Sequence, residues 1–317
     1  MLPVQHFGFD ADKRFLTVAC DQVPGRADRL PNDGKAIEAW LDHMPADSVL
    51  AVESTGACHQ LLLQCAVRRG VEIYVLNPRD IRHYAEGVRQ RAKTDRVDAH
   101  VIARYIAREK DRLRPYVEPP AGAARLEHLL RRRALIVRTK TQLKLGLEDM
   151  PSPELNALNA SFKALLAAID RAIETIMAQD EEHAQQRELL RSIPGVGPLS
   201  SVALVSLFWR LPDITADALI AFTGFDPRPR DSGNHTGQRR LSKRGDAEIR
   251  RLSYMAAKTF ARNDLGKPLY DRYRQRGLSH TAAYVILARK ILRLAHALVK
   301  QGVRFDPDRF AAACRTT

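Results

Sequence analysis

The sequence predicts an α/β domain followed by two helical parts, and three observations support this. Short strand and helix patterns alternate through residues 1–115. Residues 116–190 contain two long stretches in which apolar residues recur at helical spacing. Residues 191–317 are again mostly helical in pattern and rich in Lys and Arg. We therefore expect an N-terminal α/β domain, a helical hairpin or coiled-coil linker, and a mostly α-helical C-terminal domain, with these boundaries.

The α/β domain begins with apolar runs that end at turn residues, as buried strands do. Strands are predicted at residues 4–10, 14–20, 48–53 and 71–76. Helices are predicted at 33–43, at 57–69 and from 95 onward, with a loop at 77–94. Asn77-Pro78 stops the last strand, and the proline-rich segment 114–120 is expected to end the domain.

Four acids stand at the ends of these elements. Asp10 and Glu53 each end a predicted strand, while Asp95 and Asp98 stand at the head of a predicted helix. At a spacing of three, the two aspartates lie on one helix face, where they repel each other unless a cation lies between them. Taken alone, this pair fits a solvated helix N-terminus better. Together, the four carboxylates could hold two Mg²⁺ (or Mn²⁺) ions, which prefer oxygen ligands and act on phosphoryl groups in pairs.

The charge of the chain indicates a polyanionic partner. Lys and Arg number 51 against 37 Asp and Glu, which gives a net charge of +14. Nucleic acid is the commonest such partner, and a membrane surface is the weaker alternative. The chain has no apolar run of about 18 residues and no N-terminal leader pattern, so we expect a cytoplasmic protein with no membrane partner. The four cysteines lack the spacing of a zinc site or disulfide framework.

Basic residues surround the acids and also fill a glycine-rich loop in the C-terminal domain. Each is a candidate nucleic-acid contact, although any single one fits an ordinary solvated loop about as well. The candidates are Arg91, Lys93, Arg96, Arg228, Arg230, Arg239, Arg240, Lys243 and Arg244. Gly195 and Gly197 join them, because a Pro-Gly-Val-Gly hairpin before a helix can turn backbone N–H groups toward a phosphate.

The same basic loop holds two serines. A serine there could attack phosphorus while guanidinium groups stabilise the charge. From the residues alone, Ser232 in its Ser-Gly pair is more often a turn residue. Ser242 is the second candidate by position. His235 is close enough in sequence to accept the proton, but lone histidines in polar loops usually do not have that role.

The long helical stretches of residues 116–190, broken at 151–153, could be an arm packed on its own domain or a dimerisation arm. We favour dimerisation, because two helices of this length carry more apolar surface than a small domain needs.

These motifs together resemble a known family. The Asp10, Glu53, Asp95 and Asp98 order is similar to the Asp-Glu-Asp-Asp quartet of the RNase H/RuvC-type fold. The words Glu-Ser-Thr-Gly at 53–56 and Lys-Thr-Asp-x-x-Asp-Ala at 93–99 resemble the DEDD transposases of insertion-sequence family 110/1111, relatives of the Piv invertase. Ser-Gly at 232–233 and Lys-Arg-Gly at 243–245 are similar to the C-terminal domain of that family. Gly-Phe-Asp-Pro at 224–227 and Gly-Asp at 245–246 depart from its usual Gly-Leu-x-Pro and Gly-Asn.

The resemblance implies a Mg²⁺-dependent DNA transposase or recombinase of a bacterial insertion sequence, associated with the nucleoid. In that family the serine of the Ser-Gly word is the nucleophile, which corresponds to Ser232 and implies a covalent phosphoserine intermediate. It also implies guidance by an element-encoded non-coding RNA, and a dimer or tetramer with a catalytic site shared between protomers. The alternatives are a RuvC-like structure-specific endonuclease that uses water, a site-specific DNA invertase, and a nucleic-acid-binding protein whose acid cluster has decayed.

Overall fold

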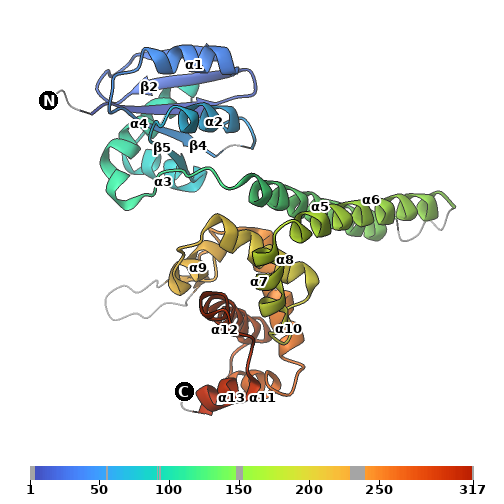
Figure 1. Ribbon diagram of the computed structural model, residues 1–317. Helices are drawn as coiled ribbons and strands as arrows, with labels where there is room; N and C mark the ends of the chain where they lie inside the picture. The colour runs from blue at the N-terminus through green and yellow to red at the C-terminus, as the bar shows by residue number, and fades with distance from the viewer. Residues whose placement is uncertain are drawn as a thin grey trace. The chain divides into compact units, whose positions relative to one another are not determined.

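The chain forms two compact units, Met1–Glu118 and Pro119–Thr317. The computed structural model (Figure 1) describes residues 4–54, 56–90, 92, 94–147, 153–228 and 240–315. The expected change from an α/β part to mainly helical parts is confirmed. Within the described residues, none of the helices has the length and apolar character that crossing a membrane requires.

Unit 1 is built on a mixed five-stranded sheet in the order β3-β2-β1-β4-β5. The strands are β1 (His6–Ala11), β2 (Phe15–Cys20), β3 (Ala27–Pro31), β4 (Val49–Glu53) and β5 (Ile73–Leu76). Strand β1 pairs antiparallel with β2 and parallel with β4. The β2–β3 pair is antiparallel, and the β4–β5 pair is parallel. The central strand β1 is therefore where the antiparallel half of the sheet meets the parallel half.

Strand β3 is missing from the sequence-based prediction. Only Leu30 of its five residues is buried, so it lacks the apolar run that reveals a buried strand. The strand lies at the edge of the sheet and ends in Pro31, a residue that edge strands tolerate. Pairing with β2, rather than its own pattern, makes this segment a strand.

Helices cover both faces of the sheet and enclose two apolar cores. On one face, α1 (Gly34–Asp42) and α2 (Gln60–Arg68) pack Ile37 and Leu62 against Phe9. On the other face, α3 (Pro78–Gly87) and α4 (Asp95–Glu109) pack against β4 and β5, and a short 3₁₀ turn, η1 (Lys110–Arg112), follows.

Residues 78–87 form the helix α3, which corrects the prediction of a loop. Asn77 caps this helix by accepting a hydrogen bond from the Arg79 amide at 2.9 Å. Pro78 occupies the first turn, where the backbone N–H that proline lacks would have no partner within the helix. The Asn-Pro pair that stops the strand therefore also starts a helix.

The described residues of unit 2 are helical apart from a short ribbon and the connecting segments. Its elements are α5 (Ala121–Gly146), α6 (Pro153–Ala178), α7 (Glu181–Arg191), α8 (Pro198–Arg210), α9 (Ala216–Thr223), β6 (Pro227–Arg228), β7 (Arg240–Leu241), α10 (Ala247–Phe260), α11 (Lys267–Gln275), α12 (His280–Gln301) and α13 (Pro307–Arg315). Helices α5 and α6 form a long hairpin (Figure 1), joined by Arg133 and Asp170 with Nε and Oδ1 2.6 Å apart. Leucines 135 and 165 of this hairpin are more than half exposed. Their role in dimerisation stays a prediction.

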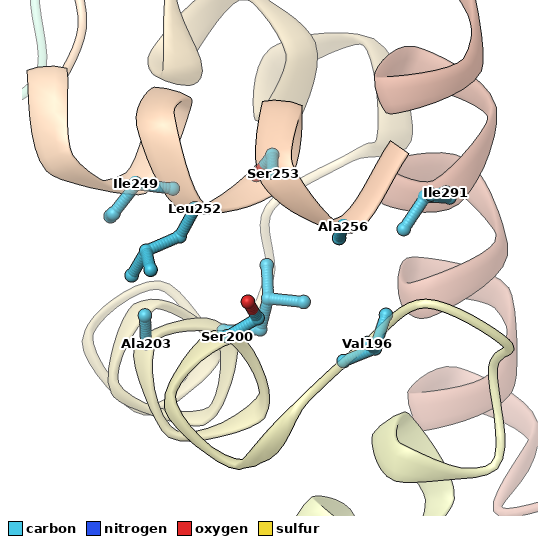
Figure 2. Close-up of a pocket in the computed structure, with 9 residues that line it drawn as sticks. Val196, Ser200, Ala203, Ile249, Leu252, Ser253, Ala256 and Ile291 are labelled. Atoms are coloured by element: carbon cyan, nitrogen blue, oxygen red, sulfur yellow. The ribbon is translucent and has the colours of Figure 1, made fainter. Parts of the chain in front are cut away.

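The core of unit 2 lies among α8, α10 and α12. Figure 2 shows how closely α8 and α10 approach: Val196, Ser200 and Ala203 lie opposite Leu252 and Ala256 across a small gap. The side chains that line this gap are apolar, apart from two serines. It is a gap in helix packing with no titratable group, so we place no chemistry there.

Candidate active site and nucleic-acid surface

Two of the predicted acids lie side by side at the carboxyl ends of neighbouring strands in the sheet. Phe9 of β1 pairs with Val52 of the parallel strand β4. Asp10 and Glu53 are the next residues on these two strands. Because the strands are parallel, both carboxyl groups occur at the same end of the sheet.

Gly8 lets helix α4 bring the other two acids to this end of the sheet. A Cβ atom at Gly8 would lie 2.3 Å from both the Ala103 nitrogen and the Ala99 oxygen, so the backbones of β1 and α4 touch here. Asp95 and Asp98 are in the first turn of α4, whose start is capped by the Thr94 hydroxyl. Gly8 is not among the residues predicted from the sequence. A glycine inside a predicted strand is the available signal, since it often marks a close backbone approach.

Replacing Gly8 by alanine should therefore destabilise unit 1 by about 3 kcal/mol, because the added Cβ meets backbone atoms that cannot move aside singly. The midpoint of urea unfolding measures this. Gly34→Ala is the control, since a Cβ there has nothing within 4 Å and the residue is helical. Equal midpoints for the two variants would contradict this account of Gly8.

The electrostatics of Asp10 show that all four acids lie near one another. The pKa of Asp10 is raised to about 6, by burial first and then by the charges of Asp95, Asp98 and Glu53 in that order. Among the described residues, however, no three His, Cys, Asp or Glu side chains are close enough to hold one metal ion. The structure thus gathers the predicted acids into an open group rather than a closed set of ligands.

A shallow depression that includes Asp95 is also lined by two arginine side chains. It is lined by Thr17, by Ala27, Asp28 and Arg29 of β3, and by Thr94, Asp95 and Arg96. Arg96 was predicted from the sequence. Arg29 was not, because strand β3 has no recognisable pattern. The Arg29 guanidinium lies 3.9 Å from the centroid of the Phe15 ring, which holds it beside the acids.

Four of the predicted nucleic-acid contacts, Arg91, Lys93, Arg230 and Arg239, lie outside the described residues. The predicted nucleophile, Ser232, lies outside them as well. The ribbon β6–β7 ends on either side of the segment 229–239, and it pairs Arg228 directly with Arg240. Both arginines are exposed. Like charges directly opposite each other destabilise a ribbon unless an anion lies between them. A bound anion would relieve this repulsion between Arg228 and Arg240, and their contact with nucleic acid stays a prediction.

Ser242 has a structural role in this ribbon. Its hydroxyl donates a hydrogen bond to the Asp226 carboxylate, and its amide donates to the Asp226 carbonyl at 2.9 Å. The next residue, Lys243, has a positive φ of 52° and donates its amide to the Gly224 carbonyl at 3.1 Å. These bonds fix the start of the basic Lys243-Arg244 pair.

Gly245 and Arg250 hold the base of the ribbon together. A Cβ at Gly245 would lie 1.8 Å from the Phe222 oxygen, so α9 and the turn before α10 meet backbone to backbone. Arg250 donates from Nη1 to the carbonyls of Thr223 and Gly245, at 3.1 Å each. Arg250 is thus a positioning residue for both ends of the ribbon.

The predicted hairpin glycines differ in their surroundings. Gly195 has φ of +91°, and a Cβ there would lie 2.5 Å from the Ala256 oxygen of α10. Gly197 caps α8 with an ordinary φ of −85° and has open space where a Cβ would be. Gly195 is thus required for packing against α10, while the space beside Gly197 is open. Their nucleic-acid contacts stay predictions.

We accordingly expect Gly195→Ala to lower the free energy of unfolding by about 2 kcal/mol, from strain at positive φ plus the clash with α10. Gly197→Ala should change it by only a few tenths of a kcal/mol to about 1 kcal/mol, because its φ suits alanine. Chemical denaturation of the two variants provides the comparison. A larger loss at Gly197 than at Gly195 would refute this distinction.

Comparisons with known proteins identify the family. A family model described as a transposase, of the DEDD type found in IS110, matches residues 7–150. A second, described as the transposase IS116/IS110/IS902 family, matches residues 187–274. The chain belongs to the IS110 family of transposases. The resemblance found in the sequence is confirmed, since the first match spans the four acids and the second spans the serine loop.

The relatives of this IS110-family transposase include a DNA-inverting protein and proteins of insertion elements. It is 26% identical over 267 residues to the pilin gene-inverting protein of Moraxella lacunata, with 81% of each chain covered. It is 24% identical over 334 residues to an uncharacterised protein of insertion element IS116 from Streptomyces clavuligerus, covering 81% of this chain and 84% of the relative. Membership makes the chain an enzyme that cleaves and rejoins DNA, and hence a DNA-binding protein. It also indicates use of a divalent metal.

Proposed function

We propose that this transposase has an RNase H-like catalytic unit and moves its own insertion element by metal-dependent transesterification. The sheet supports the fold assignment: its order β3-β2-β1-β4-β5 places a three-stranded antiparallel meander beside two parallel strands. The observation that carries the function is the gathering of four acids from β1, β4 and α4 around Asp10.

These four carboxylates suit a divalent cation in their chemistry. Carboxylate oxygens are the ligands that Mg²⁺ and Mn²⁺ prefer. Mutual repulsion of Asp10, Glu53, Asp95 and Asp98, evident in the raised pKa of Asp10, is relieved by a cation. Two such ions, when bound, would polarise the scissile phosphate and favour ionisation of an attacking hydroxyl.

Ser232 is the proposed nucleophile. Its Oγ attacks the scissile phosphorus and gives up its proton, the bond from phosphorus to the leaving sugar oxygen breaks, and that oxygen leaves as a hydroxyl after taking a proton. A second DNA end then attacks the phosphoserine with its own hydroxyl and releases Ser232. Each step exchanges one phosphoester for another, so no ATP is needed. Basic residues such as Arg228, Arg240 and Lys243 stabilise the phosphoryl charge.

The choice of DNA site is proposed to rest on a non-coding RNA encoded by the element, which pairs with donor and target, and the active species is proposed to be a dimer or tetramer. In such a system base pairing reads sequence while the protein reads backbone and shape. Site-specific inversion is the second candidate activity, and the similarity to the pilin gene-inverting protein favours it. The chemistry of the two activities is the same, and they differ in how the joined ends are arranged.

The direct test is to trap the covalent intermediate. The enzyme is expressed with the element's own ends, the reaction is denatured, and protein attached to DNA is separated by gel electrophoresis. An adduct formed with Mg²⁺ and lost with a chelator is expected, and mass spectrometry of its digest should locate the nucleotide on Ser232. Ser242→Ala should keep the adduct, because its hydroxyl is engaged by Asp226. Nicked DNA without an adduct would favour the endonuclease that uses water.

A further inference from the structure

Arg289 is a half-buried cation without a partner in the described part of the chain. It lies on α12, and its Nε atom is buried yet has no hydrogen-bond partner among the residues that the structure describes. No ion pair of its guanidinium occurs among them either. Buried charged groups are ordinarily paired, because removal from water is otherwise uncompensated.

The two acids whose charges act on Arg289 make their direct contacts with other groups. Asp217 of α9 receives Arg293, with Nη2 and Oδ1 2.7 Å apart. Asp226, which follows α9, accepts the hydroxyl of Ser242. Burial, and next the charge of Arg293, lower the pKa of Arg289, while Asp217 and Asp226 act in the other direction. An arginine remains charged under these conditions. Arg289 is therefore a charged guanidinium that has no direct contact with a carboxylate among the described residues.

The position of Arg289 near the β6–β7 ribbon indicates which kind of anion it binds. Asp226 immediately precedes β6, so Arg289 is close to the base of the ribbon that carries Arg228 and Arg240. Among the residues that the structure describes, these three guanidinium groups form no salt bridge, and Arg228 and Arg240 are paired directly across the ribbon. An extended polyanion satisfies such a set better than a single small anion does.

We propose that Arg289 binds a backbone phosphate of DNA at the base of the β6–β7 ribbon. Its Nε atom is buried, so its two Nη groups are the donors that a phosphate can reach, and together they suit two phosphate oxygens at once. This inference rests on the proposed function only in that the bound DNA is the substrate of the ribbon's serine loop. It adds a binding residue from α12, a helix distant in sequence from that loop.

The test separates binding from chemistry by using full-length protein that carries Ser232→Ala. Binding of a fluorescent duplex from the element's end is measured by anisotropy over a series of salt concentrations. Arg289→Met should weaken binding about tenfold at moderate salt and reduce the slope of log affinity against log salt by about 0.9, the value for one lost phosphate contact. Arg289→Lys should give an intermediate result, because it keeps the charge but loses the fork.

Two controls decide between a ligand contact and a structural role. Arg293→Gln removes a positive charge one turn along α12 that Asp217 already neutralises, so it should leave the salt slope unchanged. Thermal unfolding of Arg289→Met should occur at the same temperature as the parent or higher, since an unpaired charge has been removed. Parental affinity and slope in Arg289→Met, or weaker binding accompanied by earlier unfolding, would overturn the proposal.

The same titration is repeated with single-stranded RNA transcribed from the element's non-coding end. A loss confined to that RNA would also overturn the assignment to DNA. Failure of the proposed serine chemistry is recognised separately, as an absent adduct in the enzyme that keeps Ser232, while the effect of Arg289 on binding persists.

Discussion

Ser232→Ala is expected to reduce formation of the protein–DNA adduct by at least about 1000-fold, because a nucleophile has no substitute within a covalent mechanism. Affinity for DNA should stay within about twofold of the wild type, since the change removes no charge and phosphate contacts dominate affinity. Adduct yield is read from denaturing gels, and affinity from anisotropy.

The control for this experiment is the other serine of the basic loop. Ser242→Ala removes the hydrogen bond to Asp226 and should cost about 1 kcal/mol of stability while keeping the adduct. An adduct that persists in Ser232→Ala and disappears in Ser242→Ala would move the nucleophile to Ser242. DNA cleavage that survives in both variants would exclude a serine nucleophile altogether.

Asp10→Asn is expected to lower recombination at least about 100-fold and, at the same time, to stabilise the metal-free protein. The loss of activity follows from removing one of four proposed metal ligands, since metal ions supply several kcal/mol of transition-state stabilisation. The gain in stability follows from the raised pKa of Asp10, because its charge is unfavourable in the folded state. Solvent screening reduces this gain to about 1 kcal/mol at pH 7.

The pH dependence of that gain has a definite sign. The pKa of Asp10 rises from an ordinary 3.8 to about 6, so between these values the folded protein holds more protons than the unfolded chain. Stability of the wild type therefore falls, relative to Asp10→Asn, as pH rises from about 4 to about 6. Thermal unfolding in a chelator at pH 4 and pH 7 should show the two proteins close together at the lower pH and separated at the higher.

Asp12→Asn provides the matched control. Asp12 is exposed, its carboxylate accepts a hydrogen bond from the Arg14 amide at 2.7 Å, and it contributes least of the five causes to the pKa of Asp10. It should therefore keep recombination activity. Added Mg²⁺ should raise the unfolding temperature of the wild type and of Asp12→Asn, but not of Asp10→Asn. An active Asp10→Asn enzyme would remove Asp10 from the metal site.

The sequence predicted much of this site, because its acids terminate elements that have clear patterns. Asp10 and Glu53 follow apolar runs, and Asp95 and Asp98 open an amphipathic helix, so their places could be stated without coordinates. Strand β3 and helix α3 could not be predicted this way. One is an edge strand with a single buried residue, Leu30, and the other is a helix with a single buried residue, Ile81. A periodic pattern needs several buried residues before it can be recognised.

By itself, then, the sequence determined the family and the α/β-to-helical order, and it singled out the four candidate acids, since these depend on local pattern and on short motifs. Only the tertiary structure decided how they come together. Gly8 is an ordinary glycine until α4 is seen against β1, and Ser242 is a free hydroxyl until Asp226 is seen to accept from it. Arg289 resembles any basic residue on a helix until the nearby acids prove to be paired with other groups. The physical reason is that close packing and charge pairing depend on distances between segments far apart in the chain, which no local pattern encodes.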